Sequence, residues 1–288
     1  MDEKLKTNII LVSLFLLVLA NVFVWQFVFS LDNNLKVVFF DVGQGDSIFI
    51  ETPQGHQILI DGGPGKRVSA KLGRVMPFWD RSLDLVVLTH PEYDHLSGLI
   101  EVLRRYEVKN ILWTGIETSG GLFEQWQKAL AAEKARVVFA HAGETIKAGN
   151  VFGFILSPRE DLSGRTSDKG INETSVVLSL VFGANGFLFT GDIGEKTEKA
   201  LLNGTGDIGA DVLKVAHHGS KYSSSKEFLS SVAPRLAVIS CGANNSYGHP
   251  NKEVLSNLLE FGITVLRTDQ KGDITITSDG SNFKYKNK

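Results

Sequence analysis

The chain has 288 residues, with 30 Lys and Arg against 32 Asp and Glu, and 43% of its residues are hydrophobic. This balance argues against a strongly basic nucleic-acid-binding protein, although it leaves room for a local basic groove, and the apolar content excludes global disorder. The single cysteine, Cys241, excludes an intramolecular disulfide and a cysteine-rich zinc site, so any metal must be bound by histidines and carboxylates.

An apolar segment lies near the N-terminus. Residues 9–29 form a run of 21 without a charge, and as a helix this run would span roughly 31 Å, about the hydrocarbon thickness of a bilayer. Trp25 near its end fits an aromatic residue at the membrane interface. A buried core helix is the alternative, but a soluble core rarely needs so long an uncharged stretch. We therefore predict one transmembrane helix within residues 1–30, followed by a globular body over residues 31–288.

Anchor and cleaved signal are harder to distinguish. Residues 18–20 (Val-Leu-Ala) resemble a small-residue cleavage site, yet apolar residues continue for nine positions beyond them, which favours an uncleaved anchor. Lys4, Lys6 and the α-amino group precede the segment, partly offset by two acidic residues, and only Lys36 follows closely. This weak positive-inside bias predicts a single-pass protein with its body outside the cytoplasm.

The body reads as one domain of alternating short strands and helices. Leu96, Leu99, Ile100 and Leu103 share one helical face, and the most polar stretch, 157–172, reads as a surface loop. Strands are predicted at 35–40, 47–51, 57–60, 85–89, 110–113, 137–140, 151–156, 176–182, 187–190, 212–216, 236–240, 264–267 and 273–277, and helices at 96–106, 122–132, 195–202, 226–232 and 252–261. Antiparallel runs mixed with single crossover helices predict an α+β fold, in which two sheets pack face to face with helices outside.

A cluster of metal-binding residue types follows the apolar strand 85–89. His90, Glu92, Asp94 and His95 fall within six residues, in a predicted loop between this strand and a helix. A short loop on a rigid scaffold can direct several such side chains inward, and imidazole with carboxylate suits Zn, Mn or Fe. The alternative is a polar turn that only caps the helix, with Asp94 or His95 at the N-cap.

Other strand ends carry the same residue types. Asp192 follows the strand 187–190, His217 and His218 follow a third strand, and His249 lies in the sequence Tyr-Gly-His-Pro. Five of the seven histidines therefore lie at strand ends, and a random distribution along the chain does not readily explain this. Together these positions predict a metal centre.

Six motifs follow one another in a recognisable order over about Leu35 to Thr277, nearly the whole body. They are Asp41-Val42-Gly43-Gln44-Gly45-Asp46-Ser47, Leu59-Ile60-Asp61-Gly62-Gly63, His90-x-Glu92-x-Asp94-His95, Thr190-Gly191-Asp192, Leu213-Lys214-Val215-Ala216-His217-His218-Gly219-Ser220 and Tyr247-Gly248-His249-Pro250. With these motifs the chain resembles the metallo-β-lactamase fold and, more narrowly, the C-terminal hydrolase domain of the ComEC competence proteins. The resemblance implies an αββα sandwich with one or two metal ions at the edge between the sheets.

The resemblance also implies a ligand set for the metal. His90, Glu92, Asp94 and His95 match the first metal motif, Asp192 matches the carboxylate that bridges or caps the metals, and His217 matches the later histidine ligand. Which of His217 and His218 binds is open, because the two would point in different directions if the strand continued. The catalytic assignments are Asp94, which would hold or orient the attacking water, His249, which would donate a proton to a leaving group or contact a phosphate, and His218.

Two positions depart from the family pattern. Glu92 stands where the commonest motif has a second histidine and where the ComEC branch usually has aspartate. The family's separate histidine between this motif and Asp192 has no clear counterpart, since His141 lies outside the expected context and Asn172 is only a substitute through its carbonyl oxygen. We expect one or two divalent ions, Zn or Mn, and a site poorer in imidazole favours Mn²⁺ or partial occupancy.

Several residues within or beside these motifs have a structural interpretation, alone or beside a functional one. Asp41 would support the histidines from behind or shape a turn, Asp46 would simply begin the next strand, and Cys241 would be a core residue. His249 would otherwise be a surface turn residue. Lys221 and Tyr222 would contact an anionic group or have no specific role.

The resemblance implies a membrane-anchored, metal-dependent phosphodiesterase or nuclease that acts on DNA during competence and DNA uptake. The alternatives are hydrolysis of other envelope phosphodiesters or esters, and a catalytically weak accessory subunit of a DNA-uptake complex. Because the chain has one predicted span, we expect a DNA-uptake channel protein as a partner. The lack of a basic tract counts against DNA as the substrate.

Overall fold

A computed structural model describes residues 2–30, 33–204 and 206–287. The chain divides into two compact units, Met1–Asn33 and Asn34–Lys288, and the first contains the helix α1 (Glu3–Ser30). By length and composition, the stretch Glu3–Trp25 is apolar enough to cross a membrane, with a mean hydropathy of 2.4, and a signal sequence near the N-terminus would pass the same test. The expected boundary between anchor and body adjoins residues 31–32, which lie outside the described residues.

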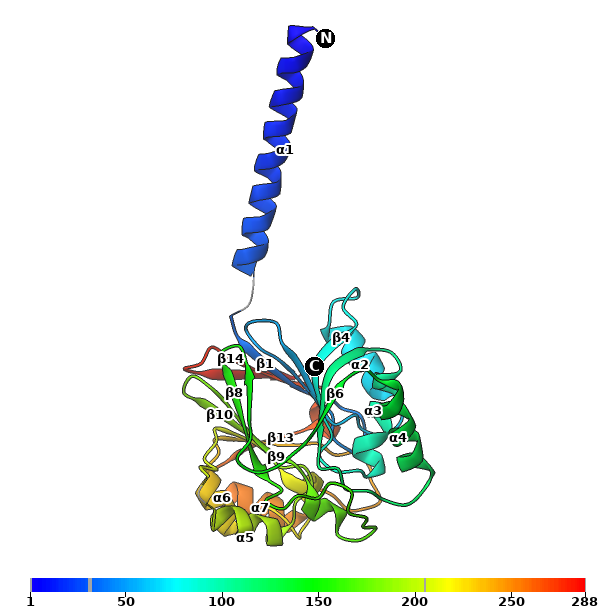
Figure 1. Ribbon diagram of the computed structural model, residues 1–288. Coiled ribbons are helices and arrows are strands. Elements are labelled where there is room, and N and C mark those ends of the chain that lie inside the picture. The colour runs from blue at the N-terminus through cyan, green and yellow to red at the C-terminus, as the bar shows by residue number, and fades with distance from the viewer. Residues whose placement is uncertain (1, 31–32, 205, 288) are drawn as a thin grey trace. The chain divides into compact units, whose positions relative to one another are not determined.

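Within the described residues, the body contains an eight-stranded sheet and a seven-stranded sheet (Figure 1). The strand order in the first sheet is β15-β14-β1-β2-β3-β4-β5-β6, and in the second β13-β12-β11-β10-β9-β8-β7. The first sheet comprises β1 (Leu35–Phe39), β2 (Ile48–Glu51), β3 (Gln57–Ile60), β4 (Ser82–Val87), β5 (Glu107–Trp113), β6 (Arg136–Phe139), β14 (Ile274–Ser278) and β15 (Phe283–Asn287). The second comprises β7 (Thr145–Ala148), β8 (Val151–Ser157), β9 (Val177–Phe182), β10 (Asn185–Phe189), β11 (Val212–Lys214), β12 (Leu236–Ile239) and β13 (Thr264–Arg267).

Helices cover the outer face of each sheet (Figure 1). The helices α2 (Arg67–Val75), α3 (Tyr93–Leu103) and α4 (Gly121–Ala132) pack on the first sheet, and α5 (Glu195–Leu202), α6 (Lys226–Val232) and α7 (Lys252–Glu260) pack on the second. Three short helical turns complete the body: η1 (Ile171–Thr174), η2 (Ala216–Gly219) and α8 (Thr268–Lys271).

The side-chain alternation of the strands explains the four layers. Along β1, Val37 and Phe39 point into the core between the two sheets, whereas Val38 points toward the helices, as the two-residue period of a strand requires. Phe187 and Leu188 divide in the same way on β10. Each sheet therefore buries both faces, and the predicted αββα sandwich is confirmed.

The structure corrects several boundaries. The helix predicted at 96–106 begins at Tyr93, so Asp94 and His95 lie in the first turn of α3 and not in a loop. The helix α2 was not predicted, because it is largely polar and buries only Val68 and Leu72. The strands β7 and β15 were also missed, since they are sheet edges whose side chains are mostly exposed and lack apolar alternation.

The loop that follows β3 packs directly against the start of α3, and glycine on both sides allows this contact. A Cβ added to Gly98 would clash with the carbonyl of Gly62, and one added to Gly62 would clash with the backbone nitrogen of Leu99. The two segments exchange hydrogen bonds, from Gly62 N to His95 O at 2.7 Å and from Gly98 N to Gly63 O at 2.9 Å. This contact fixes the position of α3 relative to β3.

We predict that Gly98→Ala lowers the free energy of unfolding by about 3 kcal/mol or more, because the added methyl group meets backbone that cannot move aside. Gly73→Ala in α2 is the matched control. A Cβ there meets nothing within 4 Å, so this change should stabilise the chain by up to about 1 kcal/mol. Urea unfolding of the full chain in detergent measures both values, and equal stability of the two variants would contradict the close packing.

Candidate metal centre

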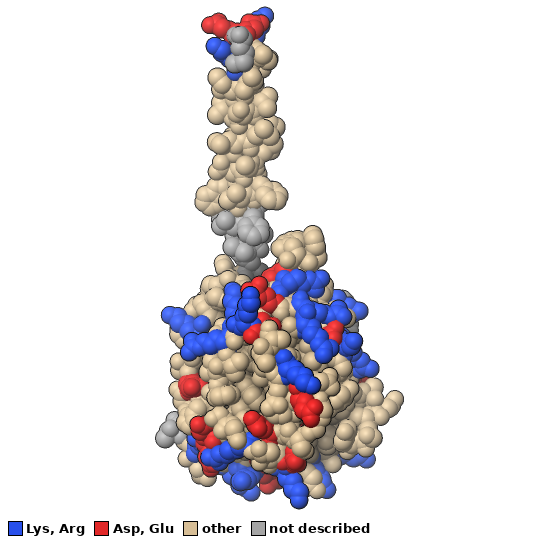
Figure 2. Space-filling model, turned by 45° about the vertical axis from the view of Figure 1, so that its right-hand side comes forward, with Lys and Arg blue, Asp and Glu red and all other residues tan. Residues whose placement is uncertain are grey.

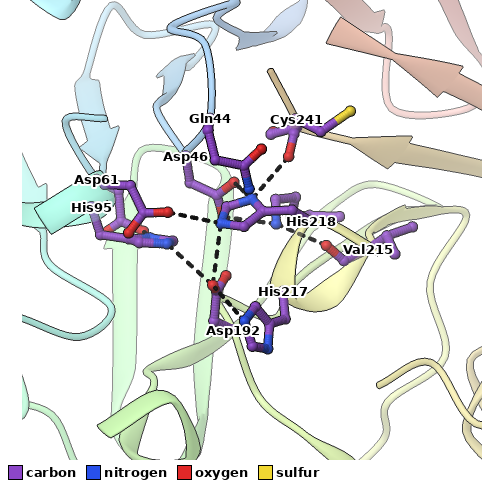
Figure 3. A network of polar contacts seen from close by, with 12 residues as sticks. Gln44, Asp46, Asp61, His95, Asp192, Val215, His217, His218 and Cys241 are labelled. Carbon is purple, nitrogen blue, oxygen red and sulfur yellow. Dashed lines mark hydrogen bonds and ion pairs between the residues drawn. The ribbon is translucent and has the colours of Figure 1, made fainter. Parts of the chain in front are cut away.

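The residues that follow four parallel strands meet at one edge of the sandwich. Asp61 follows β3, His90 follows β4, Asp192 follows β10, and His217 and His218 follow β11. The carboxyl ends of β3 and β4 coincide because these strands are parallel, and so do those of β10 and β11. Figure 3 shows His95, from the first turn of α3, and His218, from the turn after β11, directed toward Asp192.

Three buried histidines and four carboxylates form the centre of this edge. His90 and His95 are fully buried and His218 is 2% exposed. Within the part of the chain that the structure describes, ligand atoms within 4.8 Å of one another occur in four groups: His90 with His95 and Asp192; Asp94 with His95 and His218; Asp46 with Asp192 and His218; and Asp46 with Asp61 and His95. The sequence-predicted residues His90, Asp94, His95 and Asp192 are thus brought together.

One ring nitrogen of each buried histidine is held by a neighbour. His90 Nδ1 lies 3.1 Å from Thr89 Oγ1, His95 Nδ1 lies 2.8 Å from Asp61 Oδ2, and His218 Nδ1 lies 2.8 Å from the Ser240 carbonyl. Such a partner fixes the orientation of the ring and directs the other nitrogen elsewhere. In each case the other nitrogen is Nε2, which faces the centre.

These Nε2 atoms have no hydrogen-bond partner. The Nε2 atoms of His90, His95 and His218 are buried and unsatisfied, and so is Oδ1 of Asp192. Buried polar atoms without partners are costly, and several of them around one point indicate a ligand between them. Three imidazole nitrogens and a carboxylate oxygen are suitable donors for Zn²⁺ or Mn²⁺, so the residues present fit a divalent metal.

Asp61 is a positioning residue that we did not identify from the sequence. It is fully buried and accepts hydrogen bonds from Thr89 N at 2.8 Å and Thr89 Oγ1 at 2.7 Å, in addition to its contact with His95. Its φ of 56° lies in the left-handed region, which Asp tolerates better than most residues. The Asp-Gly-Gly motif after a strand was the available signal, but the motif does not show which histidine the carboxylate reaches.

Asp46 supports the second sheet's histidine. Its Oδ2 lies 2.7 Å from Nζ of the buried Lys214, and its Oδ1 lies 3.4 Å from His218 Nδ1. The prediction that Asp46 merely begins a strand therefore misses this contact. Asp41 instead accepts a hydrogen bond from Gly43 N at 3.2 Å, which is the predicted turn role.

Burial and the nearby carboxylates set the charges of the histidines. Burial lowers the pKa of His90 to about 3, so this imidazole is neutral, as a metal ligand must be. Burial also opposes charge on His95 and His218, but Asp192 and their second carboxylate partners outweigh it and raise the pKa of both well above its usual value. A cation bound at the same Nε2 atoms would displace these protons.

The carboxylates respond in the opposite sense. Burial alone would raise the pKa of Asp192, but His218 and His95 hold it well below its usual value. Asp94 behaves similarly: burial is outweighed by His218 and His95, and its pKa falls to about 2. Both groups are therefore anionic and available to a cation.

The backbone after β11 turns both neighbouring histidines toward Asp192. The strand ends at Lys214, and His217 and His218 have φ values of 48° and 54°. His218 Nε2 lies 3.2 Å from Asp192 Oδ2, and His217 Nε2 lies 4.0 Å from the same atom. We expected the two side chains to point in different directions if the strand continued through them. The strand ends before them, and the left-handed turn directs both toward Asp192.

His217 and Glu92 lie at the rim of the centre. The His217 side chain is 30% exposed, and its Nε2 lies 3.3 Å from Asn172 Nδ2, the substitute considered from the sequence. The Glu92 side chain is 42% exposed, with Oε2 3.9 Å from His90 Nε2. Burial and the charge of Asp94 raise the pKa of Glu92. His141 is exposed, and its Nδ1 faces the Ala142 carbonyl.

His249 lies beside this rim. Its ring centroid is 5.7 Å from that of His217, and it stacks on Tyr247. The Asn245 side chain holds the backbone of His249: Nδ2 donates a hydrogen bond to His249 O at 2.6 Å, and Oδ1 accepts one from His249 N at 3.0 Å. The ring atom Nδ1 of His249 is buried without a hydrogen-bond partner. Lys221 lies over the ring of Tyr222, and Cys241 is buried as expected.

Comparison with known proteins identifies the family. Residues 40–243 match the model of the metallo-beta-lactamase superfamily, so the chain belongs to this superfamily. Among curated proteins, ComE operon protein 3 of Bacillus subtilis is 32% identical over 90% of this chain and 34% of its own length. Competence protein ComA of Neisseria gonorrhoeae is 33% identical over 84% of this chain and 32% of its own length. The chain thus spans about a third of the length of these relatives.

Solved structures agree on the fold. The metallo-β-lactamase-fold protein YhfI of Bacillus subtilis has a TM-score of 0.57 and 14% identity, covering 86% of this chain and 100% of its own. CmlA, a diiron β-hydroxylase of Streptomyces venezuelae, has a TM-score of 0.53 and 15% identity, covering 84% of this chain and 54% of its own.

We predict that His218→Ala weakens metal binding more than His217→Ala does. His218 is buried, and its Nε2 lies 3.2 Å from carboxylate oxygens of both Asp94 and Asp192. Its removal should therefore weaken metal binding by more than the roughly 10–100-fold typical of an outer partner, whereas removal of His217 should not. Titration of the metal-stripped full chain with Zn²⁺ and Mn²⁺ measures both affinities. A larger loss in His217→Ala would instead assign the principal ligand to His217, as the family resemblance implies.

Proposed function

We propose that this protein is a membrane-anchored, metal-dependent phosphodiesterase that cleaves DNA at the cell surface. The observation that carries the proposal is the convergence of three unpaired buried Nε2 atoms and Asp192 Oδ1 at the edge of the sandwich. Membership of the metallo-β-lactamase superfamily and similarity to ComE operon protein 3 and competence protein ComA support the same interpretation.

The proposed metal ligands are mainly the buried residues, with further candidates at the rim. We assign metal binding to His90, Asp94, His95 and Asp192, together with His217, His218 or both, and Glu92 is a further candidate beside His90. A bound Zn²⁺ or Mn²⁺ would acidify water and neutralise charge on a phosphoryl oxygen. We propose that Asp94 would orient that water and that His249, whose ring centroid lies 5.7 Å from that of His217, would donate a proton to the leaving oxygen.

The surface beside the centre suits a nucleic acid strand. A cavity of about 680 Å³ is lined by Glu92 and Asp94 from the centre and by Lys66, Arg67, Tyr93 and Tyr247 among others. The two tyrosines are 59% and 70% exposed. Cations that contact the backbone and exposed aromatic rings that stack on bases are the features that bind single strands without sequence preference.

The cellular setting follows from α1 and from the length of the relatives. We propose that α1 is an uncleaved anchor, and that the body lies outside the cytoplasm because Lys4 and Lys6 precede the apolar stretch. We further propose a DNA-uptake channel protein as a partner, and the support is the similarity to competence protein ComA of Neisseria gonorrhoeae.

The central experiment combines metal analysis with hydrolysis assays on the full chain in detergent. We expect bound divalent metal and cleavage of both single-stranded DNA and bis(p-nitrophenyl) phosphate, with both activities lost after chelation and in Asp94→Ala and His95→Ala. Cleavage of the reporter but not of DNA would favour another phosphodiester of the envelope. A metal-loaded chain that leaves both substrates intact would favour the accessory-subunit alternative.

The proposal that DNA is the substrate can be tested with surface variants in the same assay. Lys66 is exposed at the cavity, so Lys66→Gln should raise KM for DNA and reduce the salt dependence of log KM by about one unit of slope. Hydrolysis of the small reporter should not change. Lys128→Gln, an equal change at an exposed position on α4, should leave both substrates unaffected.

We predict that protease added to intact spheroplasts degrades the body, because the positive charges before α1 place it outside. A cytoplasmic protein should survive this treatment. If the body stays protected until the membrane is lysed, it faces the cytoplasm, and the surface-nuclease proposal fails.

A further inference from the structure

An exposed aromatic pair lies in the loop between α2 and β4, away from the metal centre. Phe78 is 81% exposed and Trp79 is 73% exposed, and their rings pack edge to face with centroids 4.8 Å apart. Neighbouring aromatic residues that are this exposed are unusual on a soluble surface and indicate an interaction site. The pair takes no part in the proposed chemistry.

The register of the first sheet places this loop at the end where the body begins. Lys36 on β1 pairs with Glu51, Glu51 pairs with Gln57, and the next residue, Ile58, pairs with Leu85 on β4. Gln57 also donates a hydrogen bond to Asp80, directly after the aromatic pair, at 2.9 Å. The start of β1 and Asp84 of β4 therefore lie in one row, about 14 Å apart across three strand spacings. The Phe78–Trp79 loop adjoins this row through the contact between Asp80 and Gln57.

The connection to α1 limits how far this end can be from the end of the anchor. Five residue steps separate Ser30 at the end of α1 from Leu35 at the start of β1, and an extended chain of this length spans at most about 18 Å. If α1 crosses a bilayer, the start of β1 is held near the membrane surface, whatever angle the body adopts.

Exposed charge at this end is mainly positive. Figure 2 shows Lys and Arg side chains gathered on the upper part of the body. The exposed charged residues around this end of the sheet are one acid, Glu107, and five cations: Arg74, Arg81, Arg104, Arg105 and Lys109. Three of these cations already pair with carboxylates, Arg104 and Arg105 with Glu101 and Lys109 with Asp84. Asp80 and Asp84 are half-buried and paired, Asp80 with Gln57 and Ser82 and Asp84 with Lys109. Aromatic rings with surrounding cations are the combination that binds an anionic bilayer surface.

We infer that Phe78 and Trp79 insert into the headgroup region of the bilayer that holds α1, with the surrounding arginines on anionic lipids. This second contact rests on the proposed anchor and sets the direction of the body. The metal centre lies at the opposite ends of the strands, roughly 26 Å along β4 from Ser82 to His90. Its opening then faces the aqueous phase, which selects a dissolved polymer over a lipid as the substrate.

The experiment uses the emission of Trp79 in the full chain, reconstituted in vesicles of phosphatidylcholine and phosphatidylglycerol with a doxyl-labelled lipid quencher. Trp25→Phe removes the indole of the anchor, and Trp113 and Trp126 are buried in the body. The double variant Trp25→Phe/Trp79→Ser gives the background emission of the two buried tryptophans. Adding Tyr222→Trp to that background gives a matched exposed reporter beside η2, at the metal-centre end.

We expect blue-shifted emission from Trp79 and loss of most of it to the quencher, with no such loss from the reporter at position 222. The quenching should weaken in pure phosphatidylcholine and in Arg74→Gln/Arg81→Gln, and unchanged quenching there would overturn the anionic-lipid assignment. If the chain floats with vesicles but Trp79 is not quenched, the loop contact is wrong while the anchor stands. Quenching of both reporters would overturn the orientation.

A chain that does not float with vesicles would overturn both the anchor and this inference. The metal centre is tested separately, since hydrolysis of bis(p-nitrophenyl) phosphate in detergent does not depend on the bilayer. Phe78 and Trp79 are remote from the centre, so Phe78→Ser/Trp79→Ser should retain that hydrolysis. The quenching experiment therefore tests the membrane contact, and hydrolysis of the reporter in detergent tests the proposed chemistry independently.

Discussion

The structure depends on keeping three buried histidines aligned beside buried carboxylates. Such groups are costly to remove from water unless each has a partner, and the chain provides one for every Nδ1: Thr89 for His90, Asp61 for His95 and Ser240 for His218. The Nε2 atoms have no hydrogen-bond partner, and those of His95 and His218 lie 3.4 and 3.2 Å from the same oxygen of Asp192. Folding therefore holds several uncompensated donor atoms close together, and this makes the edge of the sandwich suitable for a divalent cation.

Several backbone features serve that alignment. The contact between Gly62 and Gly98 brings the start of α3 against the end of β3, so that His95 meets Asp61. Left-handed backbone at His217 and His218 turns two consecutive side chains toward one carboxylate, which an extended strand cannot do. Strained conformations of this kind persist where the surrounding structure determines them, as the four layers do here.

Much of the site could be predicted from residue type and order alone. His90, Asp94, His95 and Asp192 follow apolar strands, and parallel strand ends meet, so their convergence was foreseeable. The supporting residues were not. Asp46 and Lys214 are far apart in the sequence, and their buried ion pair arises only when the two sheets pack together. Similarly, the depth of His218 relative to His217 depends on a turn that no propensity predicts, because neither residue is glycine.

The sequence by itself determined the apolar N-terminal helix, the strand and helix succession of the core, and the residue types of the centre, because these follow from hydrophobic patterns and from which side chains can bind metal. Only the tertiary structure decided which nitrogen of each histidine faces the centre, and which carboxylates stand behind it. It also decided that the aromatic pair Phe78–Trp79 lies at the end of the sheet where β1 begins. These are relations between segments distant in the chain, and local patterns carry no information about the strand register and close packing that create them.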